Sequence, residues 1–246
     1  MKKFAYTLTL ALLTSTIYSH NLYAKEYTID MMECDEVNDI LLCIDKETGD
    51  NVNGIAIQYY ENGKIMLESV FKDGKQDGIS KSYYENGQLE EESVIKDGKK
   101  NGISKFYYEN GQLKAEIINK DGKKDGISKL YYGNGKLKSE ATFKDDKSNG
   151  IAKEYYENGQ LNAEIIYKDG KKDGIMKVYY ENGQLQEEAP YKDGKINGVV
   201  KQYYESGKLK QESAFKNDKQ DGFSKVYYEN GQLAGKGTYR NGERID

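Results

Sequence analysis

The 246-residue chain has few of the residues on which most catalytic and metal sites depend: one histidine, two cysteines and no tryptophan. The histidine, His20, lies in the first 24 residues, and both cysteines, Cys34 and Cys43, lie shortly after them. Nucleophile–base pairs and soft metal-ligand sets need these residue types in combination. We therefore expect no enzyme activity, no metal site and no cofactor.

Carboxylates are the remaining source of such chemistry, and Glu90 and Glu92 form one pair suited to acid–base work. Such pairs recur in only some parts of the chain, and Glu92 is expected to face a lysine, which favours a structural role. An Asp-Gly turn such as Asp97-Gly98 is also found in calcium loops, but it has no second aspartate at ligand spacing within the turn.

Long hydrophobic runs are also missing, except at the N-terminus, where an apolar stretch from Phe4 to Ile17 follows Lys2 and Lys3. Threonines and serines interrupt this stretch, which is short for a membrane span. The pattern favours a secretory signal peptide over residues 1–24, with cleavage after Ala24, rather than a membrane anchor or a buried helix. We therefore expect an exported protein that is periplasmic, surface-located or secreted.

Removal of Lys2 and Lys3 leaves 35 basic and 41 acidic side chains, a net charge of −6. This balance does not favour binding to nucleic acid, and it gives only weak support for contact with anionic membranes.

The two cysteines predict a small N-terminal cap over residues 25–53. If Asn38 and Asp39 form a two-residue hairpin turn, Cys34 and Cys43 lie directly opposite each other as a non-hydrogen-bonded pair. That geometry suits a disulfide, and export permits oxidation. Two free or metal-binding thiols are the alternative.

The rest of the chain, residues 54–246, repeats with a period of 24 residues and no insertion. A pair of tyrosines opens at the same place in eight units: Tyr59, Tyr83, Tyr107, Tyr131, Tyr155, Tyr179, Tyr203 and Tyr227. Two glycines recur with the same spacing, for example Gly78 and Gly87 in the second unit. A fixed period of this kind is typical of a repeat architecture, in which each unit packs only on its neighbours.

Each unit contains two strand-length runs and two turns. In the second unit, residues 79–84 and 89–95 are the runs, Asn86-Gly87 is a hairpin turn, and residues 96–101 lead to the next unit. No segment is left for a helix. We predict an all-β fold: an elongated, single-sheet antiparallel β-meander of eight 24-residue hairpins, with about sixteen strands, the N-terminal cap and a C-terminal cap strand.

With Asn86 and Gly87 as the two loop residues, the register of each hairpin follows. Opposite charges then face each other across the strands, which stabilises the register by ~0.2 to 1 kcal/mol per pair. The pairs are Lys81 with Glu92, Lys105 with Glu116, Lys129 with Glu140, Lys153 with Glu164, Lys177 with Glu188, and Lys201 with Glu212. The end units break the rule, since Ile57 faces Glu68 and Lys225 faces Lys236.

The second tyrosine of each pair falls on the opposite face, with leucine and other apolar or aromatic residues. This stripe is either the thin core of a curved sheet or a surface that binds a partner or a second copy of the chain. The candidate binding residues are Tyr84, Tyr108, Tyr132, Tyr156, Tyr180 and Tyr204, with Tyr60 and Tyr228 at the ends of the ladder.

The unit Tyr107–Leu113 (Tyr-Tyr-Glu-Asn-Gly-Gln-Leu), followed by Lys120–Gly126 (Lys-Asp-Gly-Lys-Lys-Asp-Gly), resembles the variant MORN repeat of bacterial proteins. The usual MORN unit has about 23 residues, and we place the extra residue here in the return strand, as a bulge that also explains Pro190. The resemblance implies the repeat fold and no catalytic residue.

The resemblance also implies several functions. MORN repeats are linked to protein association and to phospholipid contact, and similar bacterial proteins carry an antitoxin label of the YwqK type. We expect an exported, non-enzymatic scaffold that binds a protein or a cell-surface ligand. The alternatives are an antitoxin-type regulator of a partner toxin and, more weakly supported, a phospholipid-surface module.

Overall fold

The computed structural model describes residues 25–37 and 40–246, so the predicted signal peptide and the turn residues Asn38 and Asp39 lie outside it. The cap consists of β1 (Lys25–Thr28), the 3-10 turn η1 (Ile29–Met31), β2 (Met32–Val37) and β3 (Ile40–Asp45). The outgoing strands of the units are β4 (Gly54–Tyr59), β6 (Lys75–Tyr83), β8 (Lys99–Tyr107), β10 with β11 (Lys123–Lys124, Gly126–Tyr131), β13 (Lys147–Tyr155), β15 with β16 (Lys171–Lys172, Gly174–Tyr179), β18 with β19 (Lys195–Ile196, Gly198–Tyr203) and β21 (Lys219–Tyr227). The return strands are β5 (Ile65–Lys72), β7 (Leu89–Lys96), β9 (Leu113–Lys120), β12 (Leu137–Lys144), β14 (Leu161–Lys168), β17 (Leu185–Lys192), β20 (Leu209–Lys216) and β22 (Leu233–Arg240), and β23 (Glu243–Arg244) ends the sheet.

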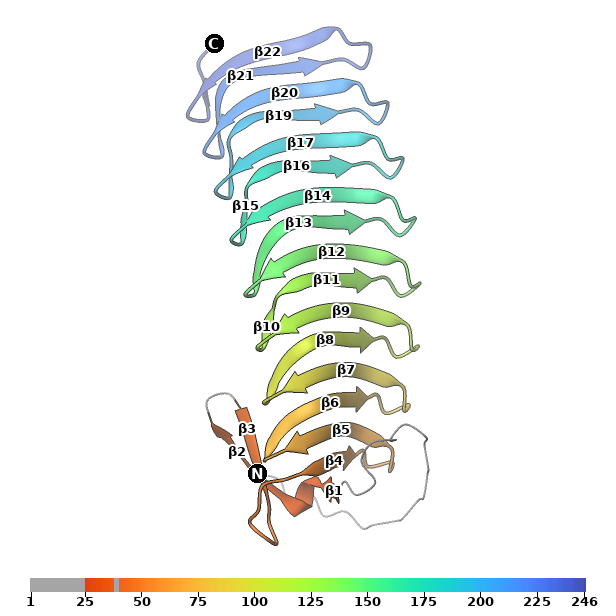
Figure 1. The fold of residues 1–246 in the computed structure, drawn as a ribbon. Helices are drawn as coiled ribbons and strands as arrows, with labels where there is room; N and C mark the ends of the chain where they lie inside the picture. The colour runs from red at the N-terminus through yellow and green to blue at the C-terminus, as the bar shows by residue number, and fades with distance from the viewer. Residues whose placement is uncertain (1–24, 38–39) are drawn as a thin grey trace.

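One long sheet of 21 strands runs the length of the molecule, and each unit pairs only with the units before and after it (Figure 1). The predicted β-meander of hairpins is therefore confirmed. The strand number exceeds sixteen because three outgoing strands are interrupted and because β1 and β23 extend the two ends. The sequence did not predict that β1 pairs parallel to β4.

The hairpin turn at Asn86-Gly87 differs from the predicted two-residue turn. The amide of Tyr84 donates to the Gln88 carbonyl at 2.8 Å, so the loop holds three residues, with Gly87 at a φ of 89°. A turn followed by a left-handed glycine is the usual three-residue hairpin loop. The register then shifts by one residue between Ser82 and Tyr83, and this bulge restores the predicted pairing further along the strands.

The connection between units, in contrast, is a two-residue hairpin turn. Asp97 and Gly98 both have positive φ, 49° and 79°, which is the type I′ geometry that matches the twist of the flanking strands. Lys96 and Lys99 face each other directly across this turn.

Each outgoing strand bends at its glycine. Ser69 pairs with Ser80 and Phe71 with Gln76, so residues 77–79 all face the single residue Val70. Gly78, at a φ of 140°, is required there because a Cβ would lie 2.8 Å from the Val70 Cβ. The outgoing strand therefore bulges at its glycine. The return strand also has the extra residue predicted for it, but near its start, because the pairing steps from Ser82–Glu91 to Tyr83–Leu89 and leaves out Glu90.

Pro190 occupies the position in its unit that corresponds to Val70. It pairs with Ile175 in its own hairpin, whereas the pairing with the next unit passes from Glu188 to Tyr191 and skips it. Its carbonyl still accepts a hydrogen bond from the Asn197 amide at 2.9 Å. The proline therefore sits where a strand of the next unit bulges away, and the missing amide removes no bond to that unit.

The bend gives the sheet two unlike faces. On the face that we call inner, Ser69, Ser93 and Ser104 are only 1–2 % exposed, and the Ser93 and Ser104 hydroxyls lie 2.7 Å apart. On the outer face lie the lysine and glutamate side chains and Ile79, which is 49 % exposed. The inner face thus provides the thin core of a one-sheet protein.

The cap closes the N-terminal end. Cys34 and Cys43 form the predicted disulfide, and the buried residues Tyr27, Val52 and Phe71 pack with Cys43. The hairpin β2–β3 projects from the sheet beside the first turns between units (Figure 1). Within residues 25–37 and 40–246, no helix is long and apolar enough to cross a membrane.

Candidate functional site

The second tyrosines of the repeated pair, which were the predicted binding residues, line one edge of the array next to the Asn-Gly loops. Each hydroxyl donates to the backbone carbonyl of the first tyrosine in the next unit. The bonds run from Tyr60 to Tyr83 (2.6 Å), Tyr84 to Tyr107 (2.7 Å), Tyr108 to Tyr131 (2.8 Å), Tyr132 to Tyr155 (2.6 Å), Tyr156 to Tyr179 (2.7 Å), Tyr180 to Tyr203 (2.8 Å) and Tyr204 to Tyr227 (2.8 Å). These rings are half-buried, so their hydroxyls join neighbouring units.

The last tyrosine of this ladder, Tyr228, shows that the burial of each ring depends on the unit beside it. Tyr228 has no following unit, and its side chain is 58 % exposed. Burial raises the pKa of Tyr84 and Tyr156, where a neighbouring unit covers the ring. The tyrosine ladder is therefore completed by the repetition of units rather than by the fold of one unit.

The loop asparagines strengthen the same edge. The Asn86 side-chain oxygen accepts from the Gln88 amide at 2.8 Å, and its side-chain nitrogen donates to the Glu109 carbonyl of the next unit at 3.1 Å. We call this side of the array the tyrosine edge. A binding role for its tyrosines remains a prediction. Their hydroxyls are engaged between units, and the ammonium groups of Lys114, Lys138 and Lys210 lie 5.6 Å from the ring centres of Tyr108, Tyr132 and Tyr204.

A row of alternating charges runs along the middle of the outer face. The register places each lysine between two glutamates, one in its own unit and one in the unit before, except for Lys225, which faces Lys236 in its own unit. The row is Glu68, Lys81, Glu92, Lys105, Glu116, Lys129, Glu140, Lys153, Glu164, Lys177, Glu188, Lys201, Glu212 and Lys225. The sequence predicted the pairs within units, and the sheet links them into one continuous row.

The first tyrosines of the pairs reach this row. Tyr131 donates to the Glu116 carboxylate at 3.0 Å, and Tyr227 donates to Glu212 at 2.9 Å. The Tyr227 hydroxyl, together with Lys225, lowers the pKa of Glu212. The Glu212 carboxylate is therefore held as an ionised acceptor in a structural network.

Next to the charged row lies an exposed apolar stripe that the sequence reading missed. It contains the residue after the bend glycine in most units, together with its partner on the return strand. We call it the apolar ridge: Ile79, Val94, Ile103, Ile127, Ile151, Ile166, Ile175 and Phe223, all exposed. A large apolar residue after nearly every bend glycine was the signal for it. Exposed apolar patches of this extent mark interaction surfaces.

The edge opposite the tyrosines consists of the turns between units, and we call it the lysine edge. There lysine faces lysine across the turn in seven units: Lys72 and Lys75, Lys96 and Lys99, Lys120 and Lys123, Lys144 and Lys147, Lys168 and Lys171, Lys192 and Lys195, and Lys216 and Lys219. Like charges directly opposite are destabilising. Only Lys192 among them forms a salt bridge within the described residues, to Asp173 at 3.0 Å.

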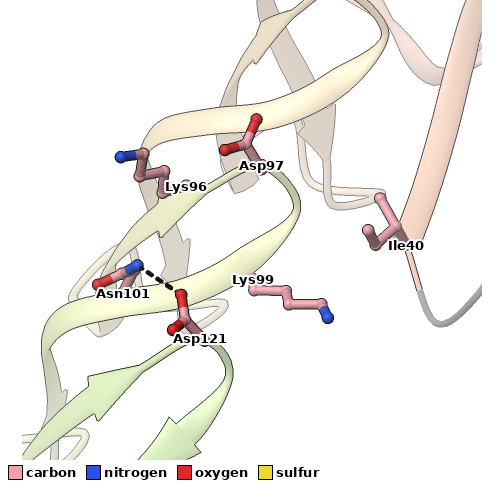
Figure 2. A pocket seen from close by; sticks show the side chains of 6 residues that line it. All are labelled: Ile40, Lys96, Asp97, Lys99, Asn101 and Asp121. Atoms are coloured by element: carbon pink, nitrogen blue, oxygen red, sulfur yellow. Dashed lines mark hydrogen bonds between the residues drawn. The ribbon is translucent and has the colours of Figure 1, made fainter.

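One hollow of about 300 Å³ lies where the cap hairpin meets this edge, between Ile40 and the turns at Lys99 and Asp121 (Figure 2). It is open, and within its lining the Asn101 side chain donates a hydrogen bond to Asp121 at 3.2 Å. Across residues 25–37 and 40–246, no group of three or more His, Cys, Asp or Glu side chains is placed to hold a metal ion.

The family model described as "MORN repeat variant" matches the chain eight times: residues 52–73, 76–97, 100–119, 124–145, 148–169, 172–193, 196–217 and 220–241. No curated protein matches it.

Solved structures share only local likeness. An alternansucrase in complex with isomaltononaose matches at 15 % identity and a TM-score of 0.23, covering 82 % of this chain and 16 % of that one. The TcdB2-TccC3-Cdc42 complex matches at 10 % identity and a TM-score of 0.17, covering 85 % and 15 %. The chain thus spans about a sixth of the length of these structures, and scores this low carry no functional argument.

Proposed function

Because the chain belongs to the family of MORN repeat variants, a class of repeat scaffold for protein or membrane binding, we propose that it is an exported, non-enzymatic scaffold that binds a protein or cell-surface ligand. The apolar ridge carries this proposal. Its isoleucines are spaced by one unit and about half exposed, and no second layer covers them. A single-sheet array offers such a surface at little cost to its core, which lies on the inner face.

Export is supported by the cap. Cys43 is fully buried and bonded to Cys34, and oxidising compartments are where such bonds persist. Cell fractionation with a label at the C-terminus tests this. Full-length protein retained in the cytosol would contradict export and favour the antitoxin-type reading, since a toxin usually acts there.

Binding is tested by changing the ridge without changing the core. We expect Ile103→Ser, Ile127→Ser and Ile151→Ser together to abolish capture of surface material, while circular dichroism stays unchanged because these side chains pack on no second layer. Tyr108→Ser, Tyr132→Ser and Tyr156→Ser form the comparison set, with the fold of both sets checked by circular dichroism. Unchanged capture by the isoleucine variant, with loss in the tyrosine variant, would move the site to the tyrosine edge.

A phospholipid surface is the second candidate, because the lysine edge borders the ridge on the outer face and the two together resemble a basic amphipathic surface. Flotation with vesicles containing phosphatidylserine tests it. Binding that requires both the lysines and the isoleucines would favour the membrane over a protein partner.

A further inference from the structure

The charge of the molecule is divided between its two parts. Residues 25–53 contain nine acidic and two basic side chains, a net charge of −7. The 35 basic and 41 acidic side chains after residue 24 therefore leave 33 basic and 32 acidic ones for residues 54–246, a net charge of +1. The turns of the lysine edge (residues 72–77 and the equivalent segments every 24 residues up to 216–221) hold 17 lysines and 12 aspartates, a net charge of +5, so the cap and this edge are opposite in sign.

The cap hairpin presents its acids outward. Glu33, Asp35 and Glu36 are exposed, and none of them forms a salt bridge within the described residues. Because side chains alternate along a strand, Glu33, Asp35 and Ile44 share one face of the hairpin, whereas Glu36 and Leu41 share the other face with the disulfide. Exposed acidic and apolar side chains are thus combined on the first of these faces.

The array shows the complementary surface. Thirteen of the fourteen facing lysines are exposed, all except Lys75, which lies nearest the cap. On the same outer face, Ile127 and Ile151 of the apolar ridge are each 48 % exposed. The units follow each other at roughly 10 Å, two strand spacings, so the lysine pairs and the ridge run side by side along the array.

Aspartates within the turns, such as Asp97 and Asp121, offset part of the charge of the facing lysines, and an excess of positive charge remains. The hairpin of the same chain lies beside the first turns of this edge, where the Cys43 amide donates to the Gly74 carbonyl at 2.8 Å, yet its carboxylates form no ion pair with those lysines. The later lysine pairs, from Lys120 onward, lie beyond it (Figure 1). An acidic hairpin from another molecule fits them in both charge and apolar character.

We propose that the cap hairpin of one copy docks on the lysine edge and apolar ridge of a second copy, over units three to six. Glu33 and Asp35 would face the lysine pairs, and Ile44, on the same face of the hairpin, would cover the ridge. Because the two surfaces differ, the contact is head-to-side and can recur from copy to copy. This goes beyond the proposed function, since it needs no outside partner and stands or fails with purified protein alone.

Sedimentation velocity of the purified, oxidised protein tests the proposal. We expect association at about 0.01 M salt and its loss at about 1 M, because screening shortens the reach of the charges about tenfold. A cap variant (Glu33→Lys and Asp35→Lys) and an edge variant (Lys120→Glu, Lys123→Glu, Lys144→Glu, Lys147→Glu, Lys168→Glu and Lys171→Glu) should each fail to associate alone.

The decisive experiment is a mixture of the cap variant and the edge variant. The lysine-bearing cap of the first variant should dock on the glutamate-bearing edge of the second, so an equimolar mixture should associate again. A control with the same charge change on the tyrosine edge (Lys64→Glu, Lys114→Glu, Lys136→Glu, Lys138→Glu, Lys208→Glu and Lys210→Glu) should associate like the unaltered protein. Unaltered protein that stays monomeric at low salt, a mixture that does not recover association, or a control that loses it would each overturn the proposal.

Discussion

The two edges of the array are built from turns that recur once per unit, but they use their side chains in opposite ways. At the tyrosine edge, a ring, a hydroxyl and an asparagine amide of one unit all bind the next, as at Tyr84 and Asn86. At the lysine edge, the side chains face their own kind, as at Lys96 and Lys99. One edge therefore joins neighbouring units, whereas the facing lysines of the other edge, apart from Lys192, form no salt bridge within residues 25–37 and 40–246.

The largest effect is expected from removing the rings of the tyrosine edge. Tyr108→Ser, Tyr132→Ser and Tyr156→Ser should lower the free energy of unfolding by about 2 kcal/mol per site, because each loses a half-buried ring and a hydrogen bond. Urea denaturation measures this. Tyr228→Ser is the control, since that ring is already exposed, and an equal loss there would mean that contacts between units do not matter.

Removing only the tyrosine hydroxyl should have a smaller effect on the free energy of unfolding. Tyr132→Phe should cost about 1 kcal/mol, because the Tyr155 carbonyl loses its donor at 2.6 Å, while Tyr228→Phe should be neutral. Thermal denaturation of the two variants side by side makes the comparison. If both change alike, the hydroxyl bond contributes nothing to stability.

At the lysine edge, by contrast, a substitution should raise the free energy of unfolding. Lys147→Glu places a carboxylate opposite Lys144 and should stabilise the fold by ~0.2 to 1 kcal/mol. The same substitution at Lys153, which lies between Glu140 and Glu164, should destabilise by a similar amount. Equal effects of the two variants on the denaturation midpoint would show that pairing across strands does not set their sign.

The smallest effect concerns alkaline pH. Burial raises the pKa of Tyr84 and Tyr156 above the value of 10.0 that an unfolded tyrosine has, so these groups stabilise the fold below pH 10. That stability is lost as the pH rises from 10 through their folded pKa. Tyr84→Phe with Tyr156→Phe should therefore flatten the fall of the denaturation midpoint above pH 10. An unchanged slope would place the alkaline sensitivity elsewhere.

Much of this architecture was open to prediction because repetition makes local signals add. The spacing of the tyrosines established the unit, and the facing of Lys81 and Glu92 established the register. The position of Cys34 and Cys43 around a short turn was enough to predict their disulfide. Each of these depends on neighbours in the chain or on a fixed period.

Other features could not be read from the chain, because they depend on the next unit or on a distant segment. The sequence left open whether the tyrosine ladder is core or a binding surface, and it did not predict that the hydroxyl of Tyr84 donates to a carbonyl 23 residues away. The strongest hairpin signal, Asn86-Gly87, formed a three-residue loop, while Asp97-Gly98 formed the two-residue turn.

What the amino-acid sequence by itself determined is therefore the unit, its period and its charge pairs, since these follow from interactions within about 24 residues. Only the tertiary structure decided which face became the core and which stayed exposed. The bend at Gly78 and its equivalents closes the inner face over the serines and turns the isoleucines outward. The physical reason is that successive side chains along a strand point to opposite faces of the sheet. Only the curvature of the assembled sheet excludes water from one of these faces.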